Sequence, residues 1–167
     1  MKKTTFSQFS KQGLMVYSTT LPFYEVYLTL IRPFLNEDQL NFQFQLELSR
    51  PTIVIQEERL LAVTNNFELF IRLKLAKEES LRNQSISYDR INLNQYHLEQ
   101  CFYELIQTIS RYYKQLHLSK ILDELSDLLS TEACKDMFNS NQLSKIEFSR
   151  LINISERTLH RLISESR

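Results

Sequence analysis

Residues 143–167 have the sequence LSKIEFSRLINISERTLHRLISESR, which predicts two short helices joined by a tight turn over 145–164. Asn153 marks the turn, since asparagine tolerates the left-handed backbone conformation that glycine usually supplies. Ser149 is the small residue expected where the two helices approach most closely, and Ser155 is the expected cap of the second helix. The spacing predicts an inward-facing apolar set of Phe148, Leu151, Ile152, Ile154, Leu159 and Leu162.

This segment resembles the helix-turn-helix of the excisionase and MerR-like families. Their pattern is an acidic-alanine first helix, a leucine-glycine-valine-serine turn, and a threonine-apolar-tyrosine-arginine second helix. The corresponding residues here are Glu147, Ser149, Asn153-Ile154-Ser155 and Thr158-Leu159-His160-Arg161, with serine standing for alanine and asparagine for glycine. The resemblance implies DNA binding, with the second helix lying in the major groove.

The resemblance also implies which side chains meet DNA. Arg157 and Arg161 are expected to pair with guanine, and Glu156 is expected to accept a hydrogen bond from cytosine N4. The cations expected to contact phosphates are Lys145, Arg150 and Arg167. Residues 140–167 carry five cations against three acids, whereas 117–138 carry two lysines against five acids. The expected DNA-binding residues are Lys145, Arg150, Ser155, Glu156, Arg157, His160, Arg161 and Ser164.

The amino-acid composition excludes some classes of function other than DNA binding. The 167 residues include one glycine, so loops that cradle phosphates through several glycines are excluded, and nucleotide enzymes of the standard types with them. Lys plus Arg and Asp plus Glu are 20 each, so nucleic acid is expected to be bound through a local patch. We expect no enzymatic activity, no catalytic or metal site and no cofactor.

The N-terminal half predicts a small mixed unit at 21–80, preceded by a polar arm at 1–20. Apolar spacing predicts a helix from Leu21 to about Pro33. Alternation of apolar and polar residues over 42–48 predicts a strand, and two more strands are expected at 52–55 and 60–64. Amphipathic spacing then predicts a helix from Phe67 to about Glu79.

Residues 50–76 also resemble the N-terminal unit of ParB-type partition proteins, which has a proline-led strand, a turn, a second strand and a helix. The matching residues are Pro51 to Ile55, Leu60 to Thr64 and Arg72 to Ala76. The glycine-glutamate-arginine-arginine motif of that family is absent, and Asn65-Asn66-Phe67-Glu68 stands in its place. Binding of cytidine triphosphate is therefore not carried over. A generic hairpin followed by a helix remains the alternative.

Polar residues from Leu81 to Asn92 predict a turn-rich boundary, after which 93–167 is expected to be helical. Helices are expected from a cap at Asn94 to Leu116, from a cap at Ser119 to Leu129, and over 131–138. The apolar stripe of the first of these is a candidate dimer seam. The fold class is thus α+β and mostly helical, with a small mixed N-terminal unit, a helical middle and a C-terminal helix-turn-helix.

These features together favour a sequence-specific DNA-binding protein, a transcriptional regulator that acts as a homodimer on double-stranded DNA. One alternative is an accessory protein of plasmid partition or of a mobile element, in which the ParB-like unit binds a protein partner. The other is a protein-interaction module without DNA affinity. Two cysteines without a CxxC pair favour the cytoplasm, and the absence of a long apolar run argues against a membrane span.

Overall fold

The computed structural model of the chain describes residues 2–5, 14–50, 52–57, 60–63, 65–75, 85–90 and 96–165. The chain divides into two compact units. The first comprises Met1–Tyr24 with Asn36–Cys101, and the second comprises Glu25–Leu35 with Phe102–Arg167. Residues 25–35 therefore belong with the C-terminal helices, although they precede most of the sheet in the sequence.

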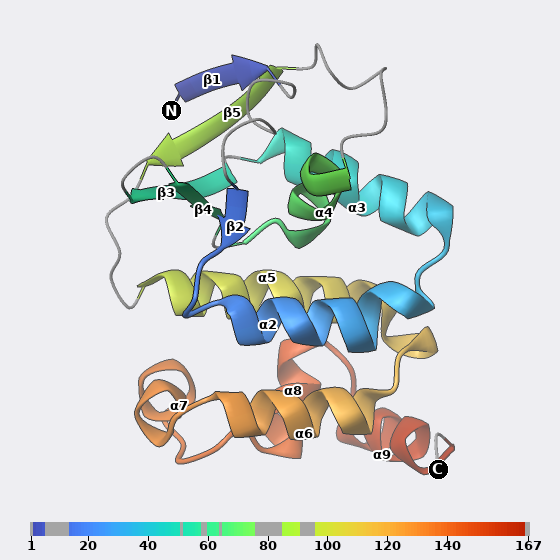
Figure 1. Ribbon diagram of the computed structural model, residues 1–167. Coiled ribbons are helices and arrows are strands. Elements are labelled where there is room, and N and C mark those ends of the chain that lie inside the picture. Colours follow the sequence, from blue (N-terminus) through green and yellow to red (C-terminus); the bar gives the residue numbers. More distant parts are fainter. Residues whose placement is uncertain are drawn as a thin grey trace. The chain divides into compact units, whose positions relative to one another are not determined.

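The first unit contains a five-stranded sheet in the order β1-β5-β3-β4-β2, drawn with α3 and α4 in Figure 1. Its strands are β1 (Lys2–Thr5), β2 (Leu14–Val16), β3 (Thr52–Glu57), β4 (Leu60–Val63) and β5 (Ser85–Arg90). The antiparallel pair β3 and β4, in which Val54 lies opposite Val63, confirms the two strands predicted at 52–55 and 60–64.

The other three strands lie where none was predicted. β2 pairs in parallel with β4, and β5 pairs in parallel with β3 and antiparallel with β1. Two of these strands fall within the predicted arm and one within the predicted turn-rich boundary. All three segments are short. β1 and β5 are mostly polar, with only Ile86 and Tyr88 alternating as large apolar residues in β5, and β2 has only three residues, all of them apolar. Their strand state therefore depends on pairing with distant strands.

The strand predicted at 42–48 is wrong, because these residues lie in helix α3 (Glu37–Ser49). A capping box starts the helix: Asn36 Oδ1 accepts from the backbone N–H of Gln39, and Gln39 Oε1 accepts from that of Asn36, both at 2.9 Å. Phe42 is 52% exposed. The buried residues of α3 have helical spacing: Leu40, Gln43, Phe44 and Glu47. Because two of them are polar, the hydropathy pattern does not show that spacing.

Helix α4 (Phe67–Leu75) begins as predicted, and residues 76–79 of the predicted helix lie outside the described ranges. It packs beside α3 (Figure 1). The buried carboxylate of Glu47 joins the two helices: Oε2 accepts from the backbone N–H of Leu69 at 2.6 Å, and Oε1 accepts from the Gln43 amide at 2.9 Å. Because Leu69 lies in the first turn of α4, Glu47 supplies an acceptor to that helix end from another part of the chain.

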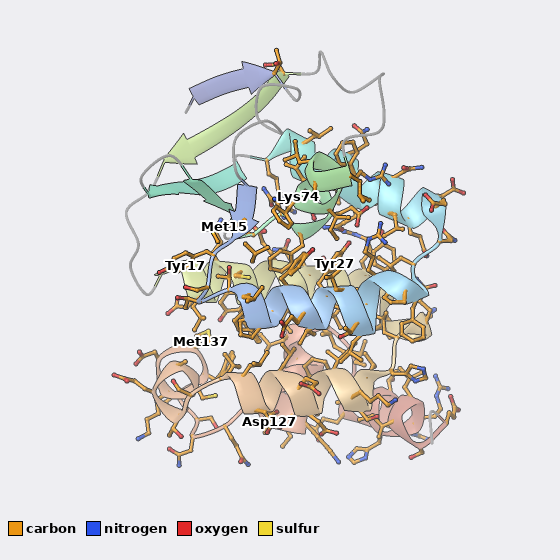
Figure 2. All side chains as sticks on the ribbon, in the orientation of Figure 1. Met15, Tyr17, Tyr27, Lys74, Asp127 and Met137 are labelled. Atoms are coloured by element: carbon orange, nitrogen blue, oxygen red, sulfur yellow. The ribbon has the colours of Figure 1, made fainter. Side chains whose placement is uncertain are left out.

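Arg72 makes a second polar connection between α3 and α4. Its Nε donates to Glu68 Oε1 at 3.1 Å, and Nη2 donates to Asn41 Oδ1 at 2.9 Å. The guanidinium carbon lies 4.8 Å from the ring centroid of Phe44. On the same helix, Lys74 (Figure 2) lies with Nζ 5.8 Å from the Phe70 ring centroid. Polar groups therefore form part of the α3–α4 contact.

The helix predicted from Leu21 to Pro33 is confirmed. It consists of α2 (Leu21–Val26), a π-helical turn η1 (Tyr27–Ile31) and a 3₁₀ turn η2 (Arg32–Phe34). Tyr27 (Figure 2) and Ile31 are buried. Phe34 contacts the His117 ring edge-on, with centroids 4.9 Å apart, so η2 packs on the C-terminal helices of the second unit.

The helical middle predicted from 94 to 138 is confirmed. It consists of α5 (Tyr96–Tyr112), a 3₁₀ turn η4 (Tyr113–Gln115), α6 (Leu118–Leu128) and α7 (Thr131–Phe138). The predicted cap Asn94 lies outside the described ranges. The predicted cap at Ser119 is wrong: the helix begins at Leu118, so Ser119 lies inside it, and the residue at the cap position is His117, whose side chain makes no cap hydrogen bond.

The apolar stripe of α5 is buried within the chain itself. Tyr103, at 38% exposed, is a large aromatic residue that this helix leaves accessible. A dimer seam through the stripe would need side chains that the monomer core already uses. These are Cys101, Phe102, Leu105, Ile106, Ile109 and Tyr112.

Candidate nucleic-acid interface

Helices α8 (Lys145–Leu151) and α9 (Glu156–Glu165) lie at the places predicted for the two C-terminal helices. The turn between them depends on Asn153, whose φ of 59° lies in the left-handed region. The N–H of Asn153 donates to Arg150 O at 3.1 Å, and that of Ile154 donates to Ser149 O at 3.0 Å. These bonds satisfy carbonyls at the end of α8 and fix where α9 begins.

Serine side chains cap both helices. Ser144 Oγ accepts from the backbone N–H of Glu147 at 3.1 Å, at the start of α8. Ser155 Oγ accepts from the backbone N–H of Thr158 at 3.1 Å, which confirms the predicted cap of α9. The Ser155 and Thr158 hydroxyl oxygens are 2.9 Å apart. The first turn of α9 is therefore held by its own side chains.

The inner side of the two helices follows the predicted spacing in part. Phe148, Ser149, Ile152 and Leu159 are buried, with Phe148 fully so. Leu151, Ile154 and Leu162 were expected inside and are only half-buried. Ile163 was missed and is buried, four residues after Leu159 on the same helical side. The four-residue spacing from Leu159 is the sequence signal that identifies Ile163 as a buried residue.

Two serines from earlier helices of the same unit hold the ends of α8. Ser110 Oγ on α5 donates to Ile152 O at 2.9 Å, where the chain leaves the helix. Ser126 Oγ on α6 donates to Leu143 O at 3.2 Å, just before the helix starts. Helix α6 also packs against α9. Sequence reasoning missed both serines, because a bond between residues 42 or 17 positions apart has no local pattern.

Within the part of the chain that the structure describes, the side chains proposed from the sequence to meet DNA are exposed. Arg157, Arg161 and Ser164 lie on the side of α9 opposite the buried Leu159 and Ile163. Glu156 is exposed at the start of the helix, three residues before Leu159 and on the same helical side. Arg167 lies outside the described residues. The exposed set is Lys145, Arg150, Ser155, Glu156, Arg157, His160, Arg161 and Ser164.

The cations of this exposed set differ in their carboxylate partners. Arg150 Nη1 lies 3.0 Å from Glu147 Oε1, and Arg161 Nε lies 3.9 Å from Glu165 Oε1. For Lys145 and Arg157, no ion pair is formed with another residue of the described part of the chain. Exposed pairs of this kind contribute little to stability, so all four cations remain available to an anion.

A buried thiol lies close to the segment that precedes α8. Cys134 on α7 is fully buried and not in a disulfide. Burial raises the pKa of the Cys134 thiol, and a hydrogen bond with the Leu143 backbone opposes the rise. A thiol with a raised pKa in a closed environment is a weak nucleophile, so Cys134 is a core residue.

Across the described ranges, no group of three or more His, Cys, Asp or Glu side chains is arranged to hold a metal ion. None of the helices in those ranges is both long and apolar enough to cross a membrane. Comparison with protein-family models, with curated proteins and with solved structures found no match for the chain.

Proposed function

We propose that the chain is a sequence-specific DNA-binding protein that inserts α9 into the major groove. The observation that carries the proposal is the division of α9 into two sides. Leu159 and Ile163 anchor it in the core, while Arg157, His160 and Arg161 face outward. A helix fixed by one side and polar on the other suits recognition of base edges.

The dimensions of α9 suit this role. Its 10 residues extend about 15 Å at the usual helical rise. The major groove of B-DNA is about 12 Å wide and admits one α-helix. Because the first helix of a helix-turn-helix crosses the backbone, Lys145 and Arg150 on α8 are the proposed phosphate contacts.

The chemistry of the outward residues suits base recognition. Arginine pairs bidentately with guanine O6 and N7, which makes Arg157 and Arg161 the proposed readers of guanine. The net excess of positive charge on α8 and α9 is small, with four cations against three carboxylates. Binding is therefore expected to need correct base contacts as well as phosphate neutralisation.

A regulator of transcription that binds as a homodimer is the form of this function we favour. One recognition helix contacts few base pairs, and two copies on half-sites about one helical turn apart give useful affinity. Because the α5 stripe is buried in the monomer, a dimer is expected to form through other surfaces.

The test is fluorescence anisotropy of a labelled duplex of random sequence, titrated with the full chain at several salt concentrations. Binding is expected at low salt and weaker binding at high salt, with the salt slope reduced by about one for each phosphate contact removed. Lys145→Ala and Arg150→Ala, which remove the proposed phosphate contacts, are compared with Lys120→Ala, a matched loss of an exposed cation on α6. Equal binding by all three variants and the original chain would overturn the proposed interface.

A protein-interaction module without DNA affinity is the second candidate. The observation in its favour is Ile146, which is 43% exposed on α8 between the proposed phosphate contacts. An exposed apolar side chain beside paired charges suits the surface of a protein complex. This alternative predicts no salt-dependent anisotropy change with any duplex.

A further inference from the structure

The chain passes from α5 to α6 through η4, and we call residues 110–117 the α5–α6 corner. Tyr112 and Leu116 are buried, so one side of the corner belongs to the core of the second unit. Arg111 and Lys114 are exposed, and the sequence of the corner contains no acidic residue. The corner is therefore more positive than α8 and α9, where three carboxylates offset four cations.

A hydrogen bond places the α5–α6 corner against the turn between α8 and α9. Ser110 Oγ donates to Ile152 O at 2.9 Å, and Ile152 directly precedes Asn153 in that turn. Figure 1 shows α9 at the end of the second unit where α5 passes into α6, with α7 at the other end, and α6 packs against α9. Four residues span at most about 14 Å, so the backbone of Lys114 lies within that distance of Ser110. Arg111 and Lys114 are therefore neighbours of the turn from which α9 starts.

The position of this turn relates the corner to DNA. In the proposed complex the start of α9 lies in the major groove, because the first residues of a recognition helix contact base edges. An element that contacts the turn before that helix lies beside the edge of the groove, which the phosphate backbone forms. The major groove is about 12 Å wide, which is comparable with the reach of the corner from the turn. Arginine and lysine side chains are common partners of phosphates at such edges.

Both cations of the corner contact neighbouring aromatic rings. The guanidinium carbon of Arg111 lies 5.9 Å from the Tyr112 ring centroid, and Lys114 Nζ lies 5.9 Å from the Tyr113 ring centroid. These distances are within the range of a cation–π interaction. A cation that is already ordered loses less conformational freedom when it binds a phosphate, which favours binding.

From this arrangement we infer that the α5–α6 corner is a second surface for the DNA backbone, on which Arg111 and Lys114 contact phosphates at the edge of the groove that α9 enters. The inference rests on the proposed function and extends the interface to residues outside α8 and α9. A structural role is the competing explanation, because Arg111 lies in the last turn of α5, where a cation interacts favourably with the helix dipole.

The experiment measures the salt dependence of binding between the full chain and a labelled duplex of random sequence, by fluorescence anisotropy. The double variant Arg111→Gln/Lys114→Gln is expected to lower the salt slope by about 1.8, at about 0.9 for each phosphate contact. Across a fourfold rise in salt, from about 50 to about 200 mM, its affinity is expected to fall about twelvefold less than that of the original chain.

Two further double variants separate phosphate contact from other effects of these cations. Arg111→Lys/Lys114→Arg keeps both charges and is expected to keep the slope. Lys120→Gln/Lys135→Gln, a matched loss of two exposed cations on α6 and α7, is expected to leave the slope unchanged. Thermal unfolding followed by circular dichroism detects a loss of stability, which a role at the helix end would cause without a change in slope.

The outcomes distinguish failure of the corner from failure of the proposed function. If Lys145→Ala and Arg150→Ala lower the slope but Arg111→Gln/Lys114→Gln keeps the slope of the original chain, the role of the corner is overturned and the proposed function stands. An equal fall in slope for the corner variant and for the matched α6–α7 variant is an effect of net charge and also overturns the corner. If the original chain does not bind the duplex at any salt concentration, the proposed function itself fails.

Discussion

Replacing Glu47 with alanine is expected to weaken the contact between α3 and α4 strongly. Glu47 is 5% exposed, and its carboxylate accepts from the Leu69 backbone N–H at 2.6 Å and from the Gln43 amide at 2.9 Å. Removing it leaves two buried donors without that acceptor, and each buried group left unsatisfied costs about 1–3 kcal/mol. The expected loss in the free energy of unfolding is therefore about 2–6 kcal/mol.

Urea unfolding followed by far-ultraviolet circular dichroism measures this loss, since the chain has no tryptophan for fluorescence. The chain forms two compact units, so two transitions are possible, and the effect is expected in the one that reports the sheet-containing unit. The control is Gln45→Ala, an exposed position on the same helix, for which the expected change is within about 0.5 kcal/mol. An equally small change for Glu47→Ala would refute the reasoning.

Three further predictions concern the second unit. Asn153→Ala is expected to cost about 1–2 kcal/mol, because alanine adopts the left-handed conformation less readily, whereas Asn153→Gly is expected to fold normally; thermal unfolding compares them. Phe148→Ala is expected to cost about 3–5 kcal/mol by opening a cavity, with the exposed Ile146→Ala as its control; equal melting temperatures would contradict this. Cys134 is expected to resist alkylation in the native chain at neutral pH, as followed by mass spectrometry; because the folded thiol keeps its proton above its ordinary pKa of 9.0, stability is expected to fall as pH rises beyond that value.

Much of the helical architecture was predictable from local spacing. The boundaries of α8 and α9 follow from a cap at Ser155 and from Asn153 in the turn, because each of these effects depends on neighbouring residues alone. The exposure of the proposed DNA-facing side chains followed from the same periodicity. The same periodicity also identifies Ile163 as buried, although Leu162 was predicted in its place.

The errors occurred where distant residues decide the structure. Gln43 and Glu47 are polar but buried, because partners on α3 and α4 satisfy them, so α3 had the hydropathy pattern of a strand. Strands β1, β2 and β5 are stabilised by pairing with strands far away in the sequence. Ser110 and Ser126 donate to the backbone carbonyls of Ile152 and Leu143 at the two ends of α8, and no local sequence motif predicts these bonds.

In the part of the chain that the structure describes, asparagine occupies the left-handed backbone positions: Asn66, Asn139 and Asn153 all have positive φ. An unfolded glycine samples more backbone conformations than an unfolded asparagine, so these turns lose less conformational entropy on folding. The strain in each folded turn is thus offset by a stiffer unfolded chain. Replacing all three with glycine would relax the native turns yet enlarge the unfolded ensemble, and refolding would have a greater loss of chain freedom to overcome.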